Sequence, residues 1–161
     1  MAFVTYPHPA LATPAPAADG VDAGLRALAD RLLSAAAEQG AYGLAAAHLG
    51  EPAPVIVLQT EAGYEALFNP QVVAVAQETE LGEEASVALP GVKAIVMRPV
   101  WAEIAYMERE GSTHRRRFEG FAARCALHEI EQMGGTFFLS NLSRLKRDMV
   151  LKRFAKVNRS G

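Results

Sequence analysis

Apolar residues recur at helical spacing in one long segment near the N-terminus. The segment begins after Asp19, a residue type that often caps helices, and runs to about Glu38. Its apolar positions, spaced mainly three or four residues apart, are Val21, Leu25, Leu28, Leu32 and Leu33. We therefore predict an amphipathic helix here. Four prolines within the first sixteen residues predict an irregular arm before it, ordered by docking onto the body.

The middle of the chain changes to the shorter periodicity of strands. A small, glycine-bounded run at 43–50 comes first, where the backbone has room to pass close to a ligand or another strand. The strand-like runs that follow are 53–60, 65–77 (read as a strand pair), 93–98, 100–110 and 114–121. Glycines and prolines separate several of them, which predicts antiparallel strands and hairpins.

Helical spacing returns in the last third of the chain. Residues 121–133 place Phe121, Cys125 and the pair 128–129 on one side, and Gly134 or Gly135 ends the helix. The basic segment 143–157 predicts a last helix. Strands between helices indicate an α+β fold.

Composition narrows the class of protein. With 161 residues, of which 50% are hydrophobic, we expect one domain spanning 1–161 with its own core. A net charge of −2 without an isolated basic arm argues against nucleic acid or a membrane as partner. The lone Cys125 excludes an intramolecular disulfide. Because no signal-peptide or membrane-length pattern is present, we expect a soluble, cytoplasmic protein.

Candidate chemistry is concentrated in the second helix. Residues 128–135 read "HEIEQMGG", close to the zinc-binding pattern His-Glu-x-x-His but with Gln132 in the place of the second histidine. His128 and Gln132 are four positions apart and share a face, while Glu129 lies about 100° away and reaches over the same spot. Taken alone, this pattern is a weak signal and is more often that of an ordinary polar helix surface.

Three separated stretches resemble, in the same order, the signature motifs of the peptide deformylases. They are "GLAAAHLG" at 43–50, "EASVALPG" at 84–91 and "HEIEQMGG" at 128–135. The start "YPHPALATPA", the "LFNP" at 67–70 and the "FFLSNLSRLKR" at 137–147 are also similar to that family. The resemblance covers nearly the whole chain, and it implies antiparallel strands wrapped around a central helix that carries the third motif.

The resemblance also implies a reaction, the removal of the formyl group from N-terminal formyl-methionine of nascent peptides. In that family a divalent metal, iron or zinc, is held by a cysteine and two histidines, and a glutamate is the general acid and base. His128 matches a metal ligand and Glu129 the catalytic carboxylate. Glu84 matches a framework position, and Arg98 resembles an arginine that helps to place the peptide.

The departures from the family pattern fall on the chemistry. Ser86 stands in the cysteine position, Gln132 in that of the second histidine, His48 in that of a glutamine beside the substrate, and Ala85 in that of a glycine. A serine hydroxyl and a carboxamide are neutral and weak ligands for iron or zinc compared with thiolate and imidazole. We therefore expect metal to be weakly bound or absent, and deformylation to be reduced or lost.

Two other functions remain open at this point. One is a noncatalytic module that holds peptide N-termini in the inherited groove. The other is a changed amidase or hydrolase acting on a small amide, through a rebuilt metal site of His48 and His128 with Glu129 or Ser86, or through Ser86 as a nucleophile with His128 as its base. In each case we expect substrate contacts from Tyr42, Gly43, Leu44, Val87, Arg98 and Leu127.

Overall fold

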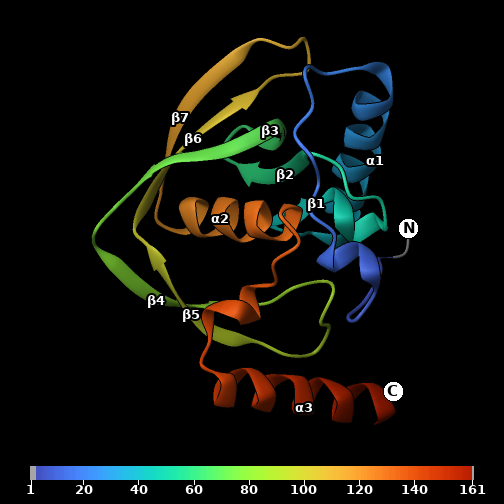
Figure 1. Ribbon diagram of the computed structural model, residues 1–161, viewed down its shortest axis with the longest axis vertical. Coiled ribbons are helices and arrows are strands. Elements are labelled where there is room, and N and C mark those ends of the chain that lie inside the picture. The colour runs from blue at the N-terminus through green and yellow to red at the C-terminus, as the bar shows by residue number, and fades with distance from the viewer. Residues whose placement is uncertain (1–2, 161) are drawn as a thin grey trace.

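The computed structural model describes residues 3–160, and side chains through residue 158. Its larger sheet has five antiparallel strands in the order β1-β2-β3-β6-β7 (Figure 1). The strands are β1 (Gly43–Ala45), β2 (Val55–Thr60), β3 (Gly63–Val75), β6 (Trp101–Met107) and β7 (Thr113–Glu119). A separate antiparallel pair is formed by β4 (Thr79–Glu84) and β5 (Ala94–Pro99).

Helices cover both faces of the larger sheet. Helix α1 (Ala23–Gln39) lies on one face and α2 (Phe121–Met133) on the other, whereas α3 (Arg144–Ser160) packs against the smaller pair. The short 3-10 turns are η1 (Pro9–Ala12), η2 (Ala46–Leu49) and η3 (Phe138–Asn141). Alternate residues of β2 face opposite ways, so Val55 and Val57 pack with α1 while Ile56 and Leu58 pack with α2. The strand is buried on both sides, and α2 lies centrally among the strands (Figure 1). The predicted α+β fold with a central motif-bearing helix is confirmed.

The smaller pair and α3 enclose a third hydrophobic cluster. Leu89, Val96, Phe138 and Val150 are its buried members from four different segments. Val150, Leu151 and Phe154 of α3 pack against this cluster, whereas Leu145, Met149 and Val157 of the same helix are exposed. Among residues 3–160, no helix combines the length and hydrophobicity that crossing a membrane requires.

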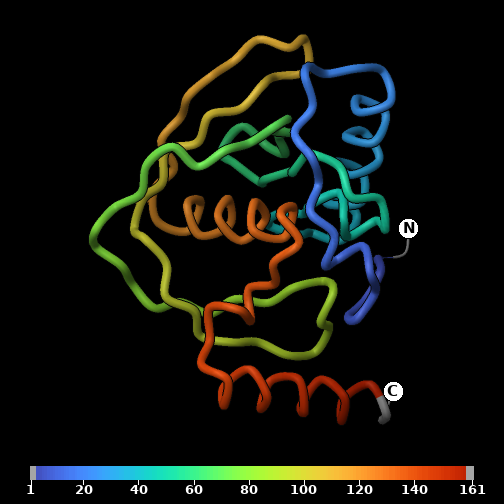
Figure 2. Tube along the Cα trace, in the orientation of Figure 1, coloured from blue at the N-terminus to red at the C-terminus, as the bar shows by residue number. Residues whose placement is uncertain are grey.

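The proline-rich arm docks as predicted. Backbone hydrogen bonds join Val4 N to His48 O (3.0 Å), Tyr6 N to Ala88 O (2.8 Å) and Ala15 N to Met133 O (3.0 Å). The arm thus passes the ends of all three motif segments, and it runs beside the end of α2 (Figure 2). Its Leu11 is 1% exposed, so burial of one leucine helps to hold it in place.

Three local predictions were wrong. The first helix is capped by Asp22, whose carboxylate accepts a 2.7 Å hydrogen bond from Leu25 N, rather than by Asp19. The run 65–77 is part of a single strand, β3, which changes partner from β2 to β6 through register shifts between Phe68 and Gln71. Strand β4 (Thr79–Glu84) is absent from the predicted strand-like runs, because its alternation of acidic and small residues carries little hydrophobic signal.

Candidate functional site

The three motif segments meet at a cavity of about 880 Å³. Residues 39–43 form one wall, residues of the 83–93 segment form another, and α2 forms the floor. The helix contributes residues at positions that share one helical face, namely Phe121, Arg124, Cys125, His128 and Glu129. His48, on η2, also lines the cavity. Segments far apart in sequence therefore place their polar groups together.

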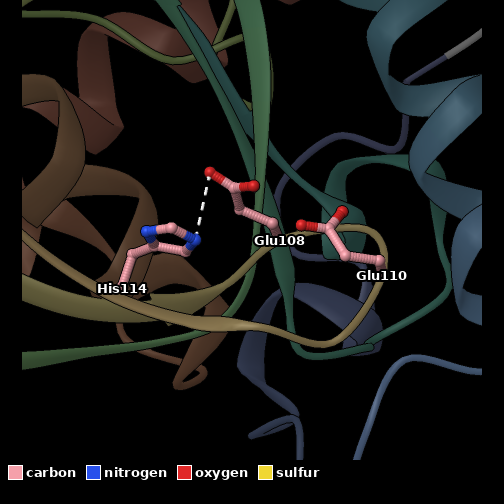
Figure 3. Close-up of side chains that lie close together, drawn as sticks. All are labelled: Glu108, Glu110 and His114. Carbon is pink, nitrogen blue, oxygen red and sulfur yellow. Dashed lines mark ion pairs between the residues drawn. The ribbon is translucent and has the colours of Figure 1, made fainter.

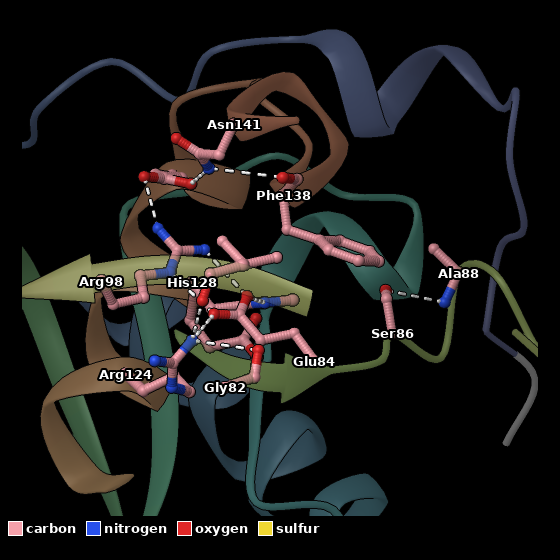
Figure 4. Close-up of polar contacts among 12 residues, drawn as sticks. Gly82, Glu84, Ser86, Ala88, Arg98, Arg124, His128, Phe138 and Asn141 are labelled. Carbon is pink, nitrogen blue, oxygen red and sulfur yellow. Dashed lines mark hydrogen bonds and ion pairs between the residues drawn. The ribbon is translucent and has the colours of Figure 1, made fainter. Parts of the chain in front are cut away.

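His128 is held by a buried carboxylate. Its Nδ1 lies 2.7 Å from Glu84 Oε1, and its ring stacks on Phe138 with centroids 5.1 Å apart (Figure 4). Burial by itself lowers the pKa of His128, but the negative charge of Glu129 and the hydrogen bond with Glu84 raise it above its usual value. The contact with Glu84 fixes the ring orientation and leaves Nε2 as the nitrogen not engaged by it.

Glu84 is the centre of a buried ion network. Its Oε2 accepts hydrogen bonds from Arg98 Nε and Arg124 Nη1, both at 2.8 Å, and its Oε1 accepts from Arg98 Nη2 at 2.9 Å (Figure 4). Burial opposes ionisation of this carboxyl, but the Arg98 and His128 hydrogen bonds lower its pKa to about 2. Because the negative charge is shared among three donors, Glu84 is a structural anchor for His128.

The pKa of the Glu129 carboxyl group is raised, whereas that of Glu84 is lowered. Burial raises the pKa of Glu129 to about 7, and its Oε1 has no hydrogen-bond partner among the described residues. A side chain at position 43 would collide with it, since a Cβ on Gly43 would lie 3.0 Å from Glu129 Cγ and 3.2 Å from Oε2. The glycine thus lets the β1 backbone approach this carboxyl closely.

His48 is neutral and also incompletely bonded. Burial, followed by the charge of His128, lowers its pKa to about 3. Its Nδ1 accepts a 3.0 Å hydrogen bond from Ala45 N, so the ring proton is on Nε2. That Nε2 is buried without a partner in the part of the chain that the structure describes, while Nδ1 lies 3.8 Å from Glu129 Oε1. Among the described residues, His48 Nε2 is thus a donor without an acceptor and Glu129 Oε1 an acceptor without a donor.

The two altered ligand positions are engaged elsewhere. Ser86 Oγ accepts a 3.0 Å hydrogen bond from Ala88 N, and no hydrogen bond links it to His128 among the described residues (Figure 4). Gln132 is 2% exposed and does not line the cavity, because its Nε2 donates at 2.7 Å to the carbonyl of Leu11 in the docked arm. Position 132 thus ties the arm to α2.

Several predicted substrate residues line the cavity and others do not. Tyr42, Gly43 and Val87 lie on its wall. Leu44 and Leu127 are turned into the hydrophobic clusters on either side of the sheet, since neighbouring strand and helix positions face the core. Arg98 is 3% exposed and fully used by Glu84 and Glu131, to which it donates at 2.6 Å. Those three predicted substrate contacts are therefore not on the cavity surface.

Some residues that line the cavity beside His128 were not predicted from the sequence. Arg124 and Phe121 precede His128 by four and seven positions, so helical spacing alone places them on its face. Phe121 makes an edge-to-face contact with Tyr42 at 4.9 Å between centroids at the cavity mouth. Cys125 lines the cavity too, but burial and the charge of Glu129 raise its pKa to about 12, which keeps it a thiol.

The described residues hold one group of three His, Cys, Asp or Glu side chains whose ligand atoms all lie within 4.8 Å of one another. It consists of Glu108, Glu110 and His114 on the β6–β7 hairpin, away from the cavity lining (Figure 3). Hydrogen bonds within the hairpin, such as Ser112 Oγ to Glu110 at 2.7 Å, account for its arrangement. His48, His128 and Glu129 do not meet the same distance condition in the described chain.

Comparison with known proteins identifies the fold and motifs together. Residues 1–148 match the family model described as polypeptide deformylase. A peptide deformylase-like protein of Rhizobium meliloti (strain 1021) is 36% identical over 160 residues, covering 98% of this chain and 93% of the relative. A peptide deformylase of the same strain is 35% identical over 159 residues, covering 96% and 91%.

Solved structures agree with the sequence comparison. The crystal structure of peptide deformylase from Ehrlichia chaffeensis in complex with actinonin is 28% identical and superposes with a TM-score of 0.91. The match covers 99% of this chain and 98% of that one. With a family match over most of its length and relatives above 30% identity, this chain belongs to the polypeptide deformylase family.

Proposed function

We propose that this protein binds the first residues of a peptide chain in the cavity, and that the metal-dependent deformylation of its family is reduced or lost. The observation that carries the proposal is the place of Gln132. The position that matches a family metal ligand is buried away from the cavity, with its amide donating to Leu11 O. Position 132, which matches a metal-ligand position of the family, here joins α2 to the N-terminal arm.

The remaining donors do not fit the family's metal. Deformylases depend on a divalent ion, and iron or zinc prefers thiolate and imidazole ligands. Here His128 is the strong donor, and Ser86 offers a neutral hydroxyl already bonded to Ala88 N. Loss of outer contacts alone typically costs about 10–100-fold in metal affinity, so two changed ligands predict weak binding. The placement of His48 does not restore a three-residue cluster with His128 and Glu129.

The altered ligand positions leave the edge of β1 (Gly43–Ala45) and the cavity beside it available to an extended peptide. Within residues 3–160, strand β1 pairs with β2 alone and so is an edge strand, and its residues 43–45 are uncharged. An extended peptide can pair with such an edge through main-chain hydrogen bonds, which need no metal. The cavity of about 880 Å³ is within the usual range for ligand sites, about 300–1,000 Å³. The edge-to-face pair of Tyr42 and Phe121 narrows its mouth.

The test combines elemental analysis, formate release and amide chemical shifts. Freshly purified protein is expected to hold little iron or zinc and to release little or no formate from formyl-Met-Ala-Ser. Methionyl peptides are expected to shift the amide signals of residues 42–46 and 86–89, with dissociation constants in the micromolar to millimolar range, about 4–8 kcal/mol. The matched control is Asp-Ala-Ser, whose charged first residue should bind more weakly.

Four results would contradict the proposal. The first is near-stoichiometric iron or zinc that survives mild dialysis. The second is substantial formate release, whether it continues after a chelator is added or its rate rises with the amount of bound metal. The third is an absence of shifts in both segments up to millimolar peptide. A preference for formylated peptide above about 100-fold would also count against it, because the ion that reads the formyl oxygen would then have to be present.

A further inference from the structure

A second groove, of about 570 Å³, lies between β5 and α3 (Figure 1). Residues 91–95 form one wall, and α3 forms the other through positions that share one helical face. Val92 and Val150 are buried at its base, whereas Ile95 and Met149 are 51% and 54% exposed. The groove therefore offers two accessible apolar side chains, one from each wall.

The groove is continuous with the cavity. Glu83, Gly91 and Lys93 line both of them, so a chain that leaves the cavity at these residues enters the groove. An extended peptide advances about 3.3–3.6 Å per residue, and its first three residues therefore span roughly 10 Å. Residues further along the same peptide are the ones that can reach the groove.

The charges along the groove are unevenly compensated. Lys93 pairs with Glu83 at 3.3 Å, whereas no carboxylate pairs with Lys146 or Arg153 among the described side chains. These two cations lie on α3, about one helical turn to either side of Met149. The α3 wall therefore presents an apolar side chain between two positive charges.

This arrangement selects the chemistry of the occupant. An apolar side chain of the ligand can be buried between Ile95 and Met149, which removes apolar surface of all three from water. Carboxylates on either side of it complement Lys146 and Arg153. A phosphate backbone would meet the same two charges but would leave the apolar side chains in contact with water. A peptide with acidic residues around an apolar one satisfies both features.

We propose that this groove binds the continuation of the peptide whose first residues occupy the cavity, and that it favours an apolar residue flanked by acidic ones beyond the third position. This rests on the proposed function and adds to it a preference for the sequence that follows the N-terminus. The two parts of one ligand are joined, so the second binding event is intramolecular and strengthens the first. A longer peptide of matching sequence should therefore bind more tightly than its first three residues alone.

The test measures dissociation constants and amide chemical shifts at pH 7 for four peptides, all amidated at the C-terminus. They are Met-Ala-Ser, Met-Ala-Ser-Gly-Glu-Leu-Glu, and two forms of the longer peptide that end in Lys-Leu-Lys or Glu-Ser-Glu. The Glu-Leu-Glu peptide is expected to bind at least about tenfold more tightly than Met-Ala-Ser and to shift the amide signals of residues 93–95 and 146–153. The Lys-Leu-Lys peptide should show no such gain, and the Glu-Ser-Glu peptide only part of it, because each lacks one of the two complementary features.

Paired charge reversals on α3 locate the effect. Lys146→Glu with Arg153→Glu should abolish the gain, because both unpaired cations of the groove are replaced. The matched control is Arg144→Glu with Lys152→Glu, which makes the same change in net charge at exposed positions of the same helix outside the groove. The control should keep the gain within about threefold of that of the unmodified protein.

The outcomes separate this inference from the proposed function. Equal affinities for Met-Ala-Ser and the Glu-Leu-Glu peptide would overturn the role of the groove and leave binding in the cavity intact. No binding of any peptide would overturn both. A gain that survives in folded protein carrying Lys146→Glu and Arg153→Glu, or that the control loses equally, would refute the assignment to these two cations. If acetyl-Gly-Glu-Leu-Glu alone binds as tightly as the seven-residue peptide, the groove takes a separate acidic ligand and the continuity is refuted. The peptide series on the unmodified protein decides the question even where a variant fails to fold.

Discussion

Replacing Glu84 by glutamine should strongly destabilise the fold, because this side chain neutralises a buried network. The change keeps the size of the side chain and removes its charge. Oε1 accepts from Arg98 Nη2 and faces His128 Nδ1, and Oε2 accepts from Arg98 Nε and Arg124 Nη1. Whichever oxygen becomes the amide nitrogen therefore opposes two of these four nitrogens.

The magnitude follows from those contacts. Hydrogen bonds to charged groups contribute about 1.5–3 kcal/mol each, and removing one partner of a buried ion pair costs about 3–5 kcal/mol. Arg98 keeps its contact with Glu131, while Arg124 keeps backbone carbonyls of Val96 and Glu80. We therefore expect a loss of about 3–5 kcal/mol, a large share of the roughly 5–15 kcal/mol typical of a domain.

The assay is urea denaturation followed by circular dichroism, with Glu83→Gln as the matched control on the same strand. Glu83 pairs with Lys93, but both side chains are more than half exposed, so its replacement should cost less than about 1 kcal/mol. Equal effects of the two variants, or a loss below about 1 kcal/mol for Glu84→Gln, would refute the reasoning.

Comparing the unmodified protein with Glu84→Gln at several pH values also tests the direction in which this stabilisation changes with pH. The pKa of Glu84 is lowered from 4.5 to about 2 in the fold, so its charge stabilises the folded state fully above pH 4.5. The difference in unfolding free energy between the unmodified protein and Glu84→Gln should therefore shrink as the pH falls from 4.5 toward 2. A difference that stays constant over this interval would show that the carboxylate charge is not what matters.

The remaining predictions concern the altered site. The double variant Ser86→Cys with Gln132→His should bind zinc, because His128 is already oriented by Glu84, whereas Ser86→Cys alone should bind far more weakly; competition with a colorimetric chelator measures both. A folded double variant without zinc affinity would show that the two positions do not converge on His128. Tyr42→Ala should change the unfolding free energy by less than about 1 kcal/mol, since Tyr42 is 60% exposed, yet strengthen binding of peptides with a bulky first residue by opening the mouth. Unchanged relative affinities for Met-Ala-Ser and Trp-Ala-Ser would exclude that role.

Local patterns in the sequence were sufficient for the regular elements. The helix at 121–133 was predicted with the bounds that the structure has, because its apolar spacing and its terminal glycine are read from consecutive residues. The family fold was also predicted from the sequence, because each of the three motifs is a run of consecutive residues and the three occur in the family's order. Residue type alone did not place the start of the first helix: Asp19 was predicted as its cap, whereas Asp22 adopts the extended cap conformation and accepts from Leu25 N. The run 65–77 was likewise predicted as two strands. It belongs to one strand, β3, which continues across Asn69 and Pro70 because its partner changes there from β2 to β6.

What the sequence by itself determined was which residue types occupy the ligand positions: His128 and Glu129 present, a thiolate and a second imidazole absent. What those residues do was decided by contacts between segments far apart along the chain. Gln132 meets Leu11 across 121 positions, and His128 meets Glu84 across 44. Whether a buried polar atom has a partner is a property of the folded packing rather than of any local run. For that reason, the satisfied Glu84 and the unmet groups of Glu129 and His48 became distinguishable only in the tertiary structure.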